Sequence, residues 1–166
     1  MDLREVQRPL KERYRADPEA SRITLRARGS TTDEAVTCSV DIGRMLYEAQ
    51  AHVGVGGPGT GACSGDLLLG ALAACAQVTT QMVATSMGIP YERIEVAVEG
   101  DLDLRGTLGL DRDVPVGFDA IRVRFEVDAP EAGEEQLAAL HEKAERYCTV
   151  LQTLRTAPAI TTELTR

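Results

Sequence analysis

The sequence predicts a single domain that combines antiparallel strands with α-helices. Two patterns carry this prediction. Apolar and polar residues alternate, as in half-buried strands, over residues 23–28, 36–40, 94–98 and 121–127. Apolar residues recur at helical spacing over about 64–87 and 134–151. With 166 residues, 43% of them apolar, the chain is long enough for one domain with a substantial core.

The first two alternating segments predict a β-hairpin with its turn at residues 29–34. In the first segment Arg26 and Arg28 share the polar face and therefore project together. In the second segment Cys38 lies on the apolar face, where a small, soft side chain packs well. We expect Cys38 to be a packing residue.

A glycine-rich loop at residues 52–66 precedes the most apolar helix of the chain. The loop lacks the spacing of a phosphate-binding loop, and no lysine follows it. Ser64 is expected to be the N-cap, and Asp66 places a negative charge in the first turn, where the helix dipole favours it. The helix should end at Gly88, a residue type that commonly terminates helices.

The later alternating segments predict an antiparallel pair, which forms either a second sheet or the rest of the first. In such a pair Glu95 and Glu99 are expected to face arginines 122 and 124 of the other strand.

Residues 134–151 predict one amphipathic helix, with Cys148 in its buried stripe. Residues 159–164 are expected to form a last strand. At the other end of the chain, residues 1–20 are charged and read as a helical or flexible arm, which leaves residues 21–166 as the domain.

The composition excludes several classes of protein. The formal net charge of −8 would repel a phosphate backbone, so no nucleic-acid partner is expected. Residues 1–15 are charged throughout, unlike a secretory signal, and no stretch is expected to supply the roughly 18 apolar residues that span a bilayer. We therefore expect a cytoplasmic protein with no membrane partner.

Four cysteines in a reducing compartment are better interpreted as free, catalytic or sensing than as a disulfide framework. They form no CxxC pair, and with only two histidines in the chain no metal site is expected. Cys63, in the glycine-rich loop, has no evident partner and is held only as a reserve candidate.

Cys75 and Cys148 attract more interest because both lie on helix faces that should turn inward. Alone, each is typical of buried packing; together, they could meet and exchange electrons. Apolar burial raises a thiol pKa, and Cys75 lies too far from the start of its helix for the dipole to lower it. Asp66, nine residues earlier, faces the opposite side of that helix. A cation or polar shell must therefore come from another segment or subunit.

One side of the central helix carries small residues, including Gly70 and Ala74. A second helix could approach closely there. The approaching helix belongs either to the same chain or to a second subunit, and the sequence leaves both open.

Two motifs in this order resemble the OsmC/Ohr family of osmotically induced and organic hydroperoxide resistance proteins. They are the run CSGDLLLGALAAC at 63–75 with Thr79, and ERYC at 145–148 with QTL at 152–154. The similarity covers about residues 23–164. The resemblance implies an α+β fold, the OsmC-like fold, with antiparallel sheets around a long central apolar helix in an intertwined homodimer.

The resemblance also implies a two-cysteine thiol peroxidase that reduces small organic hydroperoxides at the subunit interface. Cys75 matches the peroxidatic cysteine, which becomes a sulfenic acid, and Cys148 matches the resolving cysteine, which then forms the disulfide. An external dithiol, such as a lipoylated protein, would reduce that disulfide. No metal, flavin, haem or other cofactor is implied.

The family also uses an arginine held by a glutamate, and the chain departs from that pattern. Arg28 is the closest match to the arginine, although Arg26 shares its face. The glutamate position is occupied by Gly65, with Asp66 one residue later, and Thr149 follows Cys148 where one branch has proline. The chain is therefore expected to be a divergent member. Two alternatives stay open: a non-catalytic dimer that binds an apolar small molecule between its central helices, and a redox-sensing protein.

Overall fold

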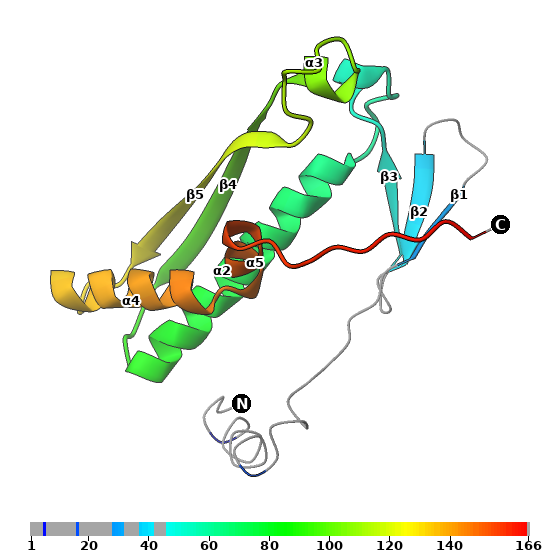
Figure 1. Ribbon diagram of the computed structural model, residues 1–166. Helices are drawn as coiled ribbons and strands as arrows, with labels where there is room; N and C mark the ends of the chain where they lie inside the picture. The colour runs from blue at the N-terminus through cyan, green and yellow to red at the C-terminus, as the bar shows by residue number, and fades with distance from the viewer. Residues whose placement is uncertain (1–4, 6–15, 17–27, 32–36, 42–45, 166) are drawn as a thin grey trace. The chain divides into compact units, whose positions relative to one another are not determined.

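The computed structural model describes residues 5, 16, 28–31, 37–41 and 46–165 (Figure 1). Antiparallel strands and helices together place it in the α+β class. The elements follow in the order β1 (Arg28–Thr31), β2 (Thr37–Asp41), β3 (Leu46–Gln50), the 3-10 turn η2 (Val53–Val55), α2 (Ser64–Met87), β4 (Arg93–Leu102), α3 (Leu104–Thr107), β5 (Phe118–Asp128), α4 (Glu134–Tyr147) and α5 (Thr149–Arg155).

These residues form two compact units. The first unit comprises the described residues of 1–69 together with 99–122, and the second comprises 70–98 together with those of 123–166. The expected N-terminal arm lies outside the described residues apart from Glu5 and Ala16, which are helical and exposed.

The first unit contains the antiparallel sheet β1-β2-β3. The predicted hairpin corresponds to β1 and β2, but residues 29–31 are paired strand rather than turn, with Thr31 opposite Cys38. A glycine and a serine are tolerated there because the ladder is made by backbone groups. Residues 23–27 lie outside the described part of the chain. The sheet also includes β3, which the sequence did not predict.

The second unit has its core against one face of α2. The buried residues of the helix recur every three or four positions: Leu72, Ala76, Thr80, Val83 and Ala84. The last two pack in a cluster with Ile89, Ile94, Ala129 and Leu140. The buried Thr80 hydroxyl donates to the Ala76 carbonyl at 2.7 Å. This hydrogen bond avoids the penalty of about 1–3 kcal/mol that a buried hydroxyl without a partner would carry.

Both ends of α2 are capped. At the C-terminus Gly88 has φ of 70°, and the N–H groups of Gly88 and Ile89 donate to the carbonyls of Thr85 and Ala84. This is the glycine-terminated end that the sequence predicts. At the N-terminus the prediction was wrong by one residue.

Cys63, not Ser64, occupies the N-cap position. Its carbonyl accepts the first helical hydrogen bond from Leu67, and its N–H donates to the Asp66 carboxylate at 2.9 Å. An acidic side chain in the third helical position commonly binds back to the cap in this way. The carboxylate of Asp66, rather than the Ser64 hydroxyl, therefore fixes where the helix begins.

The apolar length of α2 corrects another expectation. Its 24 residues are long and apolar enough to span a membrane by length and composition, although no such stretch was expected. A core helix passes the same test. The contacts of α2 are those of a core helix, because its buried stripe packs in the second unit and the Gln77 side-chain amide donates to the Ile94 carbonyl at 2.7 Å.

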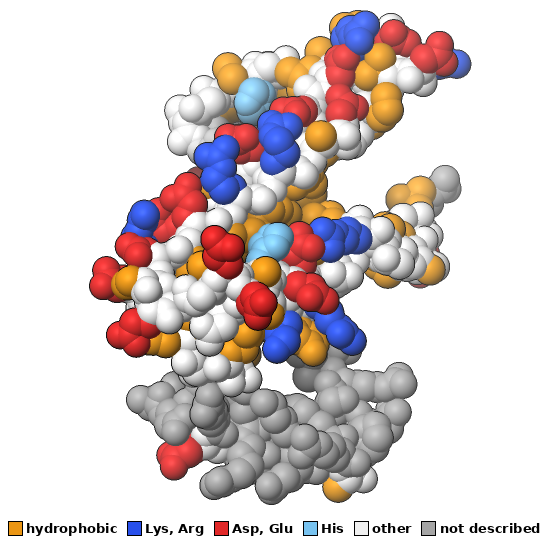
Figure 2. All heavy atoms as spheres, turned by 90° about the vertical axis from the view of Figure 1, so that its left-hand side faces the viewer, with side chains coloured by type: hydrophobic (Ala, Val, Ile, Leu, Met, Phe, Trp, Pro, Cys, Tyr) orange, Lys and Arg blue, Asp and Glu red, His pale blue; other side chains and the backbone are white. Residues whose placement is uncertain are grey.

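Strands β4 and β5 form a two-stranded sheet of their own. As expected, Arg122 reaches Glu99, at 3.4 Å, and it also binds Asp101. Glu95 instead pairs with Arg93 of its own strand at 2.8 Å. On the face shown in Figure 2, basic side chains accordingly lie beside acidic ones.

The C-terminal part differs from the prediction in two places. The single helix expected over 134–151 is two helices, α4 and α5, which are drawn separately in Figure 1. Cys148 separates them with an extended backbone, φ −73° and ψ 104°. The strand expected at 159–164 is absent, since these residues have no strand beside them in the described chain and Ile160 and Leu164 are 81% and 86% exposed.

Candidate functional site

Two cysteine thiols meet in the second unit. Cys75 lies in the middle of α2 and is partly exposed, and Cys148 lies between α4 and α5 and is fully buried. Their side chains hydrogen-bond to each other. The structure thus brings together the two cysteines, 73 positions apart, that the sequence singles out.

The break between α4 and α5 directs backbone donors toward this pair. The first N–H groups of any helix lack partners inside it. In α5 the N–H groups of Thr149 and Val150 interact with the Cys75 sulfur. The Thr79 hydroxyl, one turn along α2 from Cys75, adds a third donor.

These contacts act on the pKa of Cys75 in opposite senses. Burial raises the pKa, but the Val150 N–H, the Cys148 thiol, the Thr79 hydroxyl and the Thr149 N–H lower it, and the net effect is a pKa below that of an ordinary thiol. Hydrogen bonds to the charged form favour that form. Neutral donors therefore lower the pKa of Cys75 in the place of the expected cation.

Cys148 behaves in the opposite way. Burial raises its pKa, and the neighbouring Cys75 thiol and its charge raise it further. As the pH rises, the first proton to leave the pair therefore leaves Cys75, while Cys148 remains a thiol that donates to it.

The arginine candidates fall at the edge of the described chain. Arg28 begins β1, with its backbone opposite Asp41. Its side chain lies outside the described atoms, and Arg26 lies outside the described residues. Cys38 pairs through its backbone with Thr31 and Ala49 in the first unit.

Asp66 has a local structural role in the first unit. The Cys63 backbone N–H and then the Cys63 thiol lower the pKa of the carboxyl group, and the charge of His52 adds to this effect. The carboxylate is therefore ionised at neutral pH and bonded to the cap of its own helix.

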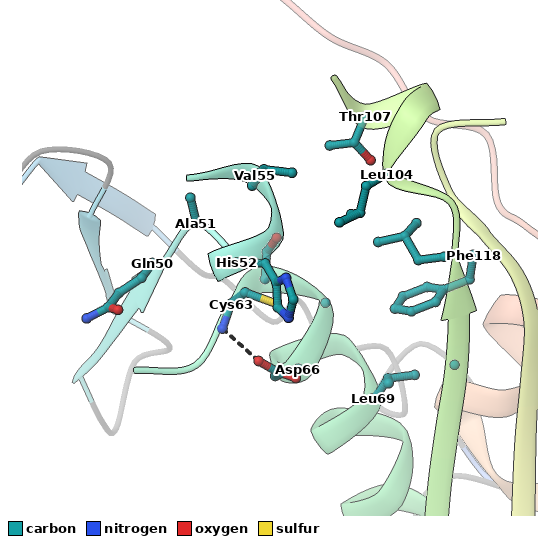
Figure 3. A pocket seen from close by; sticks show the side chains of 14 residues that line it. Gln50, Ala51, His52, Val55, Cys63, Asp66, Leu69, Leu104, Thr107 and Phe118 are labelled. Atoms are coloured by element: carbon teal, nitrogen blue, oxygen red, sulfur yellow. Dashed lines mark hydrogen bonds between the residues drawn. The ribbon is translucent and has the colours of Figure 1, made fainter. Parts of the chain in front are cut away.

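Asp66 also lines a cavity of about 490 Å³ in this unit (Figure 3). His52 and Cys63 lie beside it, and Leu104 and Phe118 form the opposite wall. Position 65 has no side chain, and an added Cβ would lie 3.4 Å from both the Cys63 sulfur and the Phe118 ring. The glycine found where the resemblance would place a glutamate thus keeps this part of the cavity open.

Sequence reasoning missed the donors around Cys75. It placed Cys148 inside one long helix, in which the N–H groups of Thr149 and Val150 would be bonded to carbonyls. The consecutive β-branched residues after Cys148 were the available signal.

Across the described part of the chain, no three His, Cys, Asp or Glu side chains converge to hold a metal ion.

Known proteins share this fold. An OsmC-like protein from Mycoplasma pneumoniae superposes with a TM-score of 0.68 and 17% identity, covering 81% of this chain and 89% of its own. An organic hydroperoxide resistance protein OsmC from Legionella pneumophila gives 0.61 and 19%, with 81% and 90% covered. An organic hydroperoxide resistance protein from Elizabethkingia anophelis gives a TM-score of 0.61 and 20% identity, with 82% of this chain and 91% of its own covered. At these identities the likeness concerns the fold.

No curated protein matches the chain in sequence. The family of OsmC-like proteins, however, matches residues 57–163, which include Cys75, Cys148 and the whole of α2. Because this match spans more than half of the chain and the solved structures share the fold, the chain belongs to the OsmC-like protein family.

Proposed function

We propose that the protein is a thiol-dependent peroxidase that reduces organic hydroperoxides through Cys75 and Cys148. The observation that carries this proposal is the hydrogen-bonded thiol pair, in which donors lower the pKa of Cys75 while Cys148 keeps its proton. A thiolate is the nucleophilic form of cysteine. Some proteins with this fold are named organic hydroperoxide resistance proteins, which supports the choice of substrate.

In the first step the Cys75 thiolate attacks the distal oxygen of the hydroperoxide. A sulfur–oxygen bond forms, the O–O bond breaks, and the leaving alkoxide takes a proton to depart as an alcohol. Cys75 becomes a sulfenic acid. Cys148 lies in hydrogen-bonding contact and still carries a proton, so it is a suitable source of that proton.

In the second step the Cys148 sulfur attacks the Cys75 sulfenic acid, a disulfide forms, and water leaves. The two steps together convert a hydroperoxide and two thiols into an alcohol, water and a disulfide. An external dithiol, such as a lipoylated protein, then restores both thiols by exchange. The cycle needs no metal or organic cofactor.

We further propose that the protein acts as an intertwined homodimer in the cytoplasm. On the side of α2 opposite its buried stripe, apolar residues are exposed, with Val78 52% and Met82 40% accessible. Nothing within 4 Å would meet a Cβ added to Gly70, so a neighbouring helix can approach closely there. A second copy covering this side would bury apolar surface that the single chain leaves in water.

Thiol counting tests the peroxidase proposal. Reduced protein mixed with cumene hydroperoxide is expected to lose two of its four thiols, while Cys75→Ser loses none. In Cys148→Ser, dimedone should trap a sulfenic acid on Cys75. Cys63→Ser is the matched control, because Cys63 caps α2 outside the thiol pair, and it should retain the full loss.

The alternatives give different results. A redox-sensing protein would oxidise once, without dithiol-driven turnover of hydroperoxide. A non-catalytic binder of apolar molecules would show no thiol loss and unchanged binding after both cysteines become serine. Either result would replace the peroxidase proposal.

A further inference from the structure

The donors that face Cys75 are available only because the helix is interrupted at Cys148. In a continuous helix the Thr149 N–H would donate to the Glu145 carbonyl, four residues earlier. The Cys148 N–H still makes such a bond, to Ala144 at 3.1 Å, and is the last to do so in α4. The Glu145 carbonyl therefore requires another donor.

That donor is Gln152, in the middle of α5. Its side-chain amide donates to the Glu145 carbonyl at 2.8 Å in a partly buried position. Its backbone N–H donates to the Cys148 carbonyl at 2.9 Å. One residue thus binds the last turn of α4 and the first residue of the interruption.

We propose that Gln152 is a positioning residue of the thiol site: its side chain occupies the Glu145 carbonyl, which leaves the Thr149 N–H free for the Cys75 sulfur. Without this amide the carbonyl would be left without a donor, at a cost that rejoining the two helices would relieve. Rejoining them would turn the Thr149 N–H away from Cys75. The catalytic importance of Gln152 rests on the proposed peroxidase function, but its effect on Cys75 does not.

A second link joins the same two helices and provides the control. Arg155 of α5 forms an ion pair with the Glu145 carboxylate at 3.1 Å, with the Arg155 side chain 52% exposed. Exposed ion pairs contribute about 0–1 kcal/mol. If the helices only needed to be tethered, loss of Arg155 would matter as much as loss of Gln152.

The test compares the pH at which Cys75 becomes reactive. Iodoacetamide labelling of each reduced variant is followed by mass spectrometry of the peptide that contains Cys75. In Gln152→Met, which keeps the length but not the donor, the midpoint should rise by about 0.5–1 pH unit, the equivalent of one hydrogen bond. Gln152→Lys restores a donor and should return the midpoint toward wild type. Arg155→Met should leave it unchanged.

An unchanged midpoint in folded Gln152→Met, or an equal rise in Arg155→Met, would overturn the proposal. Should Gln152→Met fail to fold, NMR of the wild-type protein decides: the Gln152 side-chain amide protons must be protected from exchange, and exchange as fast as in a free glutamine counts against the role. Because none of these readouts needs hydroperoxide turnover, a protein without peroxidase activity would refute the proposed function and leave this test intact.

Discussion

At the scale of single residues, Cys75 and Cys148 should leave a signature in the pH dependence of stability. The folded pKa of Cys75 is lowered, so its contribution to the free energy of unfolding rises with pH from that pKa up to the unfolded value of about 8.5. The pKa of Cys148 is raised, mainly by burial, so the contribution of Cys148 to the free energy of unfolding falls as the pH rises above the pKa of the unfolded thiol.

We therefore compare the unfolding free energy of wild type with that of the double variant Cys75→Ser, Cys148→Ser. The difference between them should pass through a maximum at about pH 8.5, the pKa of an unperturbed thiol. Urea unfolding under reducing conditions measures this difference between about pH 6 and 10, the range in which thiols titrate. When the single variant Cys75→Ser takes the place of wild type in this comparison, the rise of the difference at pH values below the maximum should disappear. A difference that is flat with pH would contradict the order of ionisation.

At the scale of elements, the core of the second unit depends on α4 packing through Leu140, which is 1% exposed. Leu140→Ala should lower the free energy of unfolding by about 2–5 kcal/mol, because it removes buried methyl groups and leaves a cavity. Leu110→Ala, at a leucine that is 72% exposed, should change it by no more than about 0.5 kcal/mol. Both free energies of unfolding are measured by chemical denaturation. A loss in Leu140→Ala as small as that in Leu110→Ala would show that α4 is not part of the core.

The elements also show how far the sequence predicts this fold. Long periodic segments such as α2, β4 and β5 were predicted because one face of each is packed over many residues. β3 begins with two adjacent large residues, Leu46 and Tyr47, and so lacks the alternation that marks β2, and α3 is a single turn, too short to show a helical period. The end of α2 at Gly88 was predicted since a positive φ favours glycine.

The candidate site was predicted in part for a related reason. The spacing of apolar residues places Cys75 and Cys148 on inward faces, and the structure brings them together. The donors around Cys75 depend instead on where α4 ends, which the side chain of Gln152, four residues after Cys148, helps to decide. The helical spacing of apolar residues continues from α4 into α5, so it gives no sign of the break at Cys148.

At the scale of the whole molecule, the exposed apolar side of α2 predicts self-association. Val78→Glu would bury a charge in the proposed interface, and burial of an unpaired charge is strongly unfavourable. Light scattering after size-exclusion chromatography should give twice the chain mass of 17.9 kDa for wild type and one chain mass for the variant. The control Val116→Glu, at an exposed valine outside α2, should remain dimeric. A monomeric wild type would refute the dimer.

The chain passes between its two compact units inside α2, β4 and β5, at residues 69–70, 98–99 and 122–123. Neither unit is therefore a continuous stretch of sequence, and no linker separates them. A truncation or gene fusion at any one of these crossings would cut a hydrogen-bonded element. Neither unit can therefore be excised or exchanged as one continuous segment of the chain.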